Sequence, residues 1–324
     1  MRIFLWHIHG SWTTALVQGR HEYLLPVLPA GGPDGRGRAE TWDWPEAARE
    51  VTPAEAADND VDVVLLQRPE EVELCAQWLG GRRPGFDVPA VYVEHNAPQG
   101  RIAEMLHPLA DRPELTLVHV THFNDLFWDA GATPTHVIEH GVLDPGYRYT
   151  GELERCAVAI NEPGRRGRVT GTDLLGRFER AAPIDLFGIG AGELGGLEDP
   201  PQALLHEELP RRRLYLHPIR WTSLGLTLIE AMHLGMPVVA LATTEAPEAV
   251  PSDAGLLSTS VDALCGRIRA LMADPDEARE WGVRARRAAL DRYSLERFLT
   301  NWDDLLGELT GAPPEFGQRE EVAA

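Results

Sequence analysis

Short apolar runs alternate with helix-like stretches along almost the whole chain, and this alternation restricts the possible folds more than any other feature. The strand-like runs are Ile3–Ile8, Val61–Leu66, Ala90–Glu94, Leu115–Thr121, His136–Ile138, Ala157–Ile160, Ile184–Gly188, Leu214–Leu216, Val238–Ala242 and Gly255–Leu257. Strands that alternate with helices form parallel βαβ units with right-handed crossovers. We therefore expect an α/β protein with two Rossmann-like, doubly wound parallel sheets.

A chain of 324 residues suits two domains of ~150 residues each. Pro145, Gly146 and Gly151 separate the first series of strands from the second. The expected units are residues 1–145, residues 146–293, a C-terminal helix over 294–312 that packs back on the first domain, and a flexible tail over 313–324. Two such domains form a cleft between the carboxyl ends of their strands, so the loops leaving those ends are expected to carry the chemistry.

Composition excludes several classes of partner. The formal net charge of −20 argues against binding to nucleic acid or to anionic lipid. No apolar run reaches the ~20 residues of a membrane helix, and the first apolar run is too short for a signal peptide. Three separated cysteines indicate a reducing compartment and no cysteine-rich metal site. These features predict a cytoplasmic protein.

The segment from His217 to Glu248 predicts a loop, a helix, a tight turn, a buried strand and a second loop. The amides of Ser223, Leu224 and Gly225 would lie at the N-terminus of this helix, where phosphate oxygens bind readily. Its later turns are mostly apolar but contain Glu230, and a buried carboxylate is costly unless it is paired. Glu230 is therefore a candidate ligand-binding group, although a structural Glu with its own partner fits the pattern too.

This segment resembles the donor-binding signature of retaining glycosyltransferases of family 4, which have the GT-B fold and a pattern close to P-S-x-x-E-G-F-G-L-x-x-x-E-A-M-x-x-G-x-P-V-V-A. The matching positions are Pro218, Gly225, Leu226, Glu230, Ala231, Met232, Gly235, Pro237, Val238, Val239 and Ala240. The resemblance implies that Glu230 binds the ribose of the nucleotide. Thr222 stands where the family has the Glu that commonly contacts the donor sugar.

Other segments extend the resemblance. Val137–Val142 is similar to the family's interdomain V-I-P-N-G-V, and Cys156–Gly171 is similar to its strand followed by G-R…K-G. The family's Arg and Lys hold the diphosphate. Here both positions differ, and the positive charge comes from three arginines, Arg165, Arg166 and Arg168.

Arginine binds phosphate oxygens bidentately, so the resemblance implies that at least one of the three meets the diphosphate. A solvated basic loop is the alternative for each. The turn at Gly188–Gly192 resembles the family's I-V-G-x-G turn beside the nucleotide base, which makes Gly190 a binding candidate.

In the first domain, His9, Gly10 and Ser11 end the first strand. Gly10 allows close approach of a ligand, and Ser11 is placed to cap the next helix. His7 and His9 share one strand face, but no third metal ligand is evident.

Three further segments end strands at the expected cleft. His95 resembles the family's cleft histidine, which contacts the donor sugar, and Asn96 follows it. His122 lies at the next strand end, on the expected acceptor side. Glu245 and Glu248 follow the strand after the signature helix, where the resembled family often has a Glu near the base or the interdomain hinge. A solvent-facing position fits both carboxylates equally well.

The resemblance implies a hexosyltransferase-type enzyme that transfers a sugar from a nucleotide-diphosphate-sugar, of UDP or GDP type, with retention of configuration. His95, Arg165 and Arg168 would be its catalytic residues, and no metal or further cofactor is implied. Two alternatives remain: a sugar-nucleotide epimerase on the same scaffold, and a nucleotide-sugar-binding subunit without catalysis.

Overall fold

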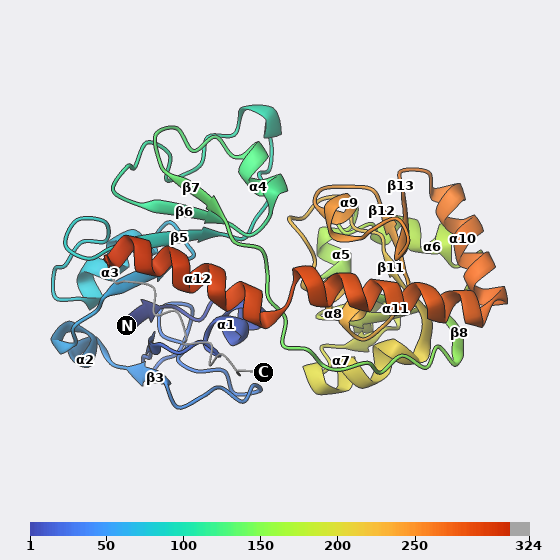
Figure 1. The fold of residues 1–324 in the computed structure, drawn as a ribbon, viewed down its shortest axis with the longest axis horizontal. Helices are drawn as coiled ribbons and strands as arrows, with labels where there is room; N and C mark the ends of the chain where they lie inside the picture. The colour runs from blue at the N-terminus through green and yellow to red at the C-terminus, as the bar shows by residue number, and fades with distance from the viewer. Residues whose placement is uncertain (312–324) are drawn as a thin grey trace, which may run out of the picture.

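The computed structural model describes residues 1–311, which form two parallel β-sheets with helices on both faces of each (Figure 1). The first sheet has seven strands in the order β3-β2-β1-β4-β5-β6-β7. The second has six strands in the order β10-β9-β8-β11-β12-β13. Every pair of neighbouring strands is parallel, so the predicted fold class is confirmed.

The first sheet consists of β1 (Arg2–Leu5), β2 (Glu22–Pro26), β3 (Ala48–Val51), β4 (Val63–Leu66), β5 (Ala90–Glu94), β6 (Thr116–His119) and β7 (Thr135–Val137). The central strands β4, β5 and β6 are buried at every position, as expected for strands covered on both faces. One face packs against α1 (Gly10–Leu16) and the other against α2 (Pro53–Asp58) and α3 (Glu71–Trp78). The short helix α4 (His122–Phe127) follows β6.

The second sheet consists of β8 (Leu153–Ala159), β9 (Ile184–Gly188), β10 (Leu197–Glu198), β11 (Arg212–His217), β12 (Val238–Leu241) and β13 (Gly255–Ser258). Its helices are α5 (Pro163–Arg166), α6 (Leu175–Phe178), α7 (Gln202–Glu208), α8 (Leu226–His233), α9 (Ala246–Ala249), α10 (Val261–Ala273) and α11 (Pro275–Arg292). Helices α7, α8 and α9 pack on one face, and α6 and α10 pack on the other.

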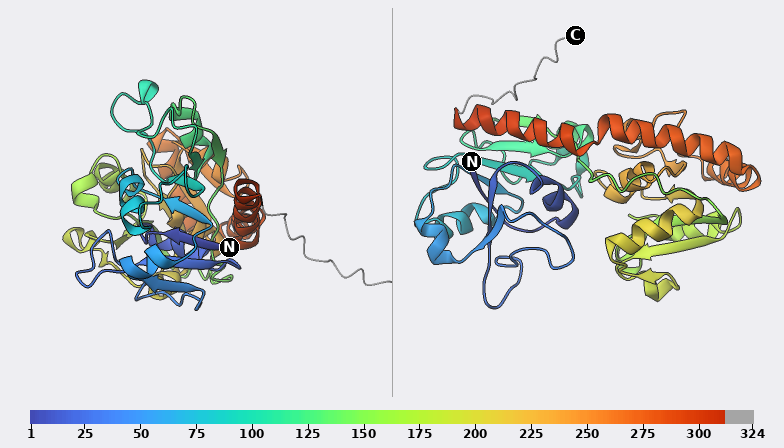
Figure 2. Two further views of the ribbon diagram at one scale, coloured as in Figure 1. Left: turned by 90° about the vertical axis from the view of Figure 1, so that its left-hand side faces the viewer. Right: turned by 60° about the horizontal axis from the view of Figure 1, so that its bottom comes forward.

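The last described helix, α12 (Leu295–Thr310), returns to the first domain, as both views of Figure 2 show. Phe298, Trp302 and Leu306 are buried in the same apolar cluster as Trp12 of α1. The chain therefore crosses between the domains twice, and the crossings meet where Val142 N–H donates to Tyr293 O at 3.1 Å. The predicted tail over 313–324 lies outside the described residues.

All ten predicted strands are present, and three others were missed: β2, β3 and β10. Two of the missed strands, β3 and β10, lie at sheet edges. An edge strand has one paired neighbour and leaves some of its side chains in solvent, so it lacks the continuous apolar run by which a central strand is recognised.

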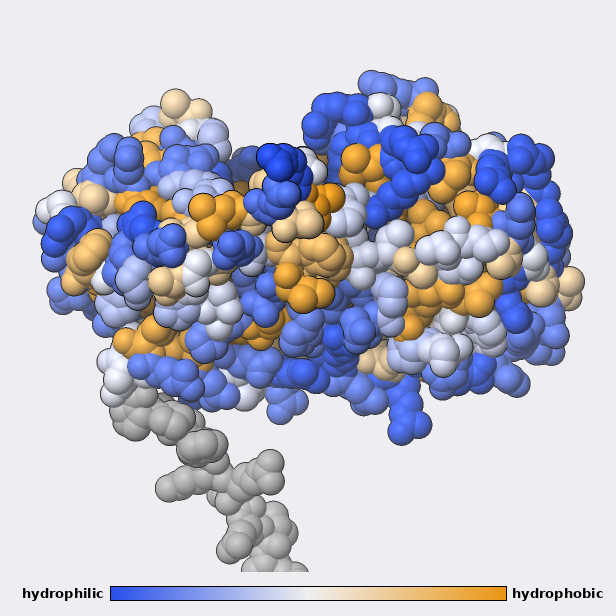
Figure 3. Space-filling model, turned by 90° about the horizontal axis from the view of Figure 1, so that it is seen from above, coloured by the Kyte–Doolittle hydropathy of each residue, from blue (hydrophilic) through white to orange (hydrophobic). Residues whose placement is uncertain are grey.

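The face seen in Figure 3 is largely hydrophilic, with apolar patches on both lobes. No helix within residues 1–311 is both long and apolar enough to cross a bilayer.

Candidate active site between the two sheets

The predicted signature segment forms the rim of the second sheet. Strand β11 ends at His217, the loop runs to Gly225, and α8 begins at Leu226. Ser223 and Leu224 are buried just before the helix, whereas Thr222 is half-exposed. A Cβ on Gly225 would lie 2.9 Å from Cε1 of His217, so the loop can fold tightly onto β11 because this residue is glycine.

Glu230 lies inside α8 and is only 4% exposed. The side-chain amide of Gln202, the first residue of α7, donates to its Oε1 at 2.5 Å. His206 Nε2 lies 3.8 Å from the other carboxylate oxygen. The predicted buried carboxylate is therefore paired, and its partner comes from a helix that no sequence pattern connected with it.

The three arginines Arg165, Arg166 and Arg168, in the segment that follows β8, have different surroundings. Arg165 is 70% exposed and paired with Glu162, and Arg168 is 79% exposed with Asp173 at 3.4 Å. Arg166 is half-buried, and no carboxylate within residues 1–311 pairs with it. Burial and the neighbouring Arg165 charge lower the pKa of Arg166. The chain has 30 arginines and no lysine. The positive charge that a lysine supplies in the resembled G-R…K-G motif therefore comes from arginine here.

This arginine loop is joined to the signature segment. Gly171 has a φ of +75°, and a Cβ there would lie 1.9 Å from Pro218 O. The backbone amides of Arg220 and Trp221 both donate to Val169 O, at 2.9 and 3.2 Å. The loops that follow β8 and β11 therefore form one continuous edge of the second sheet, which we call the second rim.

The turn containing Gly190 already holds an anion from the protein. The amides of Gly190 and Gly192 donate to the two carboxylate oxygens of Glu198, at 2.7 and 2.9 Å. A nucleotide base beside this turn would meet side chains or other backbone groups, because these two amides are occupied.

At the edge of the first sheet, which we call the first rim, three histidines lie in a column. The rings of His9 and His95 lie 3.8 Å apart between centroids, and His140 stacks on His95 at 6.4 Å. Trp12 meets His95 edge-on at 5.1 Å. His95 Nε2 and His140 Nδ1 are buried without a hydrogen-bond partner among the described residues.

The column is uncharged at neutral pH. Burial lowers the pKa of His9 to about 4 and that of His140 to about 3. Burial, together with the neighbouring imidazoles, holds the pKa of His95 well below its ordinary value. His140 belongs to the interdomain segment V-I-E-H-G-V, at the position of the family's Asn, and only the fold shows that it joins the other two.

The remaining first-domain candidates lie at the same carboxyl edge. Gly10 and Ser11 are the first two residues of α1, and the N-cap is His9 without a side-chain cap. The prediction that Ser11 caps this helix is therefore wrong, because the helix starts one residue before it. Asn96 is exposed after β5, and His122 is exposed as the first residue of α4.

The two rims touch through hydrogen bonds that cross the domains. Ser223 Oγ donates to the backbone oxygen of His95, and Trp221 Nε1 donates to Pro98 O at 2.8 Å. Glu245 is 1% exposed, and its Oε2 accepts from Phe123 N–H at 2.8 Å. In this structure the Glu245 carboxylate is thus an interdomain contact, and binding of substrate there would require this contact to open.

Burial raises the pKa of Glu245. Its other oxygen lies 3.4 Å from Arg292, which also binds Glu139. The contact therefore links α4 to the segment where the chain crosses between the domains. Within residues 1–311, no group of three or more His, Cys, Asp or Glu side chains is arranged to hold a metal ion.

Residues 197–288 match the family model of glycosyl transferases group 1. No curated protein matches the chain in sequence. A sucrose-phosphate synthase from Thermosynechococcus elongatus has the same fold, with 15% identity over 96% of this chain and 100% of that chain and a TM-score of 0.71. HepE from Anabaena, solved in complex with UDP, gives 15% identity over 95% and 100% of the two chains and a TM-score of 0.67.

A glycosyltransferase from Rickettsia africae gives 14% identity over 95% of this chain and 98% of that chain, with a TM-score of 0.60. At these identities the likeness shows the fold. The chain therefore has the GT-B fold, and its residues 197–288 are similar to glycosyl transferases group 1.

Proposed function

We propose that this protein is a glycosyltransferase that takes a sugar from a nucleoside-diphosphate donor and transfers it to an acceptor with retention of configuration. The observation that carries the proposal is the rim formed by residues 218–230. It combines buried residues just before α8 with the hydrogen-bonded carboxylate of Glu230, within the segment that matches glycosyl transferases group 1.

The main chemical task in this reaction is departure of the nucleoside diphosphate, whose negative charge grows as the bond to the sugar breaks. The N-terminus of α8 favours an anion through the backbone amides of its first turn and through its dipole. Among the three candidate arginines, we assign the diphosphate contact first to Arg166, because Arg165 and Arg168 are already paired with carboxylates. Such preorganised charges lower the barrier without reorganising during the reaction.

The sugar would lie against the first rim, where His95 belongs to a neutral column that can donate or accept hydrogen bonds without carrying a charge. Thr222 is half-exposed and can make neutral hydrogen bonds to the sugar, weaker than those of the family's carboxylate. The hydrogen bond from Ser223 to His95 O supports a mechanism in which the two rims close over the donor.

The test is release of nucleoside diphosphate from a panel of UDP- and GDP-sugars, with Glu230→Ala as the site variant and Glu207→Ala, exposed on α7, as the matched control. We expect one donor to be consumed and the site variant to bind it at least ~30-fold more weakly, as expected when a charged hydrogen-bonding group is lost. NMR of the anomeric carbon of the product reports retention. Equal donor binding by Glu230→Ala would contradict the proposed site. Donor-dependent thermal shifts without turnover would instead support a binding subunit.

A further inference from the structure

The carboxylate of Glu230 shares its site with an amide from α7. Gln202 approaches Glu230 Oε1 at 2.5 Å, and the approaching atom is the amide nitrogen, since two oxygens at that distance would repel each other. His206, one turn later on the same helix, is buried and lies 3.4 Å from the Gln202 amide nitrogen. One face of α7 is therefore polar and directed at Glu230.

Two oxygen atoms of this cluster lack a hydrogen-bond donor. Gln202 Oε1 is buried without a partner among the described residues. Glu230 Oε2 accepts no hydrogen bond within residues 1–311. His206 Nε2 lies 3.8 Å from it, which is too far for a hydrogen bond. A buried acceptor without a donor is destabilising, as Gln202 Oε1 is here, and a ligand that brings two donors would satisfy both this oxygen and Glu230 Oε2.

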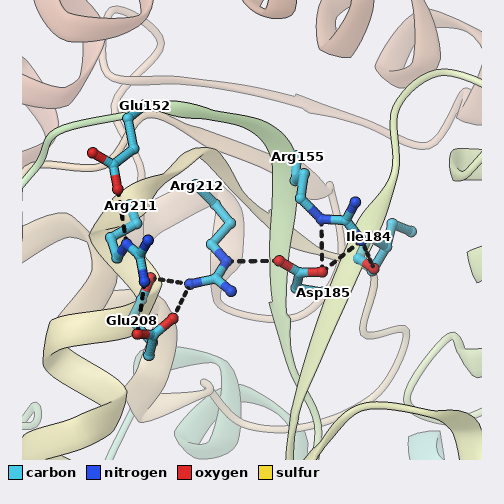
Figure 4. A network of polar contacts seen from close by, with 7 residues as sticks. All are labelled: Glu152, Arg155, Ile184, Asp185, Glu208, Arg211 and Arg212. Carbon is cyan, nitrogen blue, oxygen red and sulfur yellow. Dashed lines mark hydrogen bonds and ion pairs between the residues drawn. The ribbon is translucent and has the colours of Figure 1, made fainter.

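The far end of α7 is fixed to the sheet, which keeps Gln202 in place. Figure 4 shows Asp185 of β9 joining Arg155 of β8 and Arg212 of β11. Arg212 also binds Glu208, the last residue of α7, at 2.6 Å. The Gln202 side chain therefore extends from an anchored helix and not from a free loop.

We propose that Gln202 is a specificity-determining residue for the nucleotide: its Oε1 and the Glu230 carboxylate accept hydrogen bonds from the two vicinal hydroxyls of a ribose. Because Glu230 Oε1 is shared with the Gln202 amide, the 3′-hydroxyl binds Oε2 of Glu230 and the 2′-hydroxyl binds Oε1 of Gln202. A 2′-deoxyribose lacks the donor for Gln202 Oε1 and leaves this oxygen unpaired. The inference rests on the proposed function, because it places a nucleotide at Glu230.

The experiment is isothermal titration of the full-length protein and of Gln202→Ala with UDP, GDP and their 2′-deoxy counterparts. For the parent we expect the preferred ribonucleotide to bind at least ~10-fold more tightly than its deoxy form, as expected for one lost hydrogen bond to a buried acceptor. In Gln202→Ala the ribonucleotide should bind ~10-fold more weakly, and the ribo-to-deoxy ratio should fall to within about twofold. Glu207→Ala, exposed on the same helix, should keep the parent ratio.

Thermal unfolding of each variant separates loss of binding from loss of fold. A parent ratio that is unchanged in Gln202→Ala overturns the inference and leaves the proposed function standing. Tighter binding by Gln202→Ala also overturns it, since Gln202 would then block the site. Failure of the parent to bind either diphosphate overturns both proposals.

Discussion

The two rims differ in charge and in how the chain assembles them. The first rim is a column of neutral imidazoles from three separate segments, those of His9, His95 and His140. The second rim is built from charged groups, chiefly Arg166 and Glu230, on loops and helices of one domain. A donor with an uncharged sugar and an anionic diphosphate would match this division, with the sugar on the first rim and the diphosphate on the second.

The largest effect is expected from breaking the second rim at Gly171. Gly171→Ala places a Cβ 1.9 Å from Pro218 O in a left-handed conformation and should lower the free energy of unfolding by about 3 kcal/mol or more. Gly195→Ala is the matched control, because Gly195 has a φ of +77° but open space around its Cβ position. Urea unfolding measures both. Equal losses of stability in the two variants would show that the clash between the added Cβ and Pro218 O costs nothing.

Breaking the first rim at His95 should affect turnover more than stability. His95→Phe keeps a ring in the column between His9 and His140 but removes both nitrogens, so we expect kcat/KM to fall ~100-fold. The free energy of unfolding should change by less than ~1.5 kcal/mol. His136→Phe, at an exposed position of β7, serves as the control. Unchanged turnover in His95→Phe would remove this rim from the chemistry.

The arginines sharpen the comparison on the charged side. Arg166→Ala should weaken binding of the nucleoside diphosphate by ~10- to 50-fold, because a charge-assisted contact is lost. Arg165→Ala and Arg168→Ala should weaken it less than ~3-fold, since both side chains are exposed and paired. Titration calorimetry gives the three affinities. A larger loss for Arg165→Ala or Arg168→Ala than for Arg166→Ala would reverse the assignment.

The smallest effect concerns the pH dependence of the neutral column. The pKa of His140 falls from 6.5 in the unfolded chain to about 3 in the folded protein. The unfolded state therefore binds more protons in this range, and stability falls as the pH drops below 6.5. Each such histidine contributes up to ~1.4 kcal/mol per pH unit in that window.

Replacing His140 with Phe should remove about one histidine's share of this slope. Urea unfolding at pH 7.5, 6.0 and 5.0 measures it, with His136→Phe as the control that retains the parent slope. A parent-like slope in His140→Phe would mean that His140 is not buried in its neutral form.

The fold and the second rim were largely predictable, because the residues that define them are close in sequence. The run from Leu226 to Ala240 specifies helix α8, its glycine stop and strand β12 through local spacing alone. Ser11 shows the limit of such reasoning, since a capping residue is recognised only once the first helical residue is known. Gly190 shows another: its glycine pattern was visible, but the carboxylate that occupies its amides was not.

The sequence by itself determined that the chain forms two parallel sheets and that Glu230 lies in an apolar helix where it needs a partner. Hydrophobic periodicity and glycine positions shape the chain over a few residues, so they can be recognised from the sequence alone. Only the tertiary structure decided that Gln202 is that partner, that His140 joins His9 and His95, and that Ser223 binds the backbone of His95. These contacts join segments far apart in the chain. Which of them form depends on which strand ends the sheets bring together and on which polar atoms are buried away from water and need a partner.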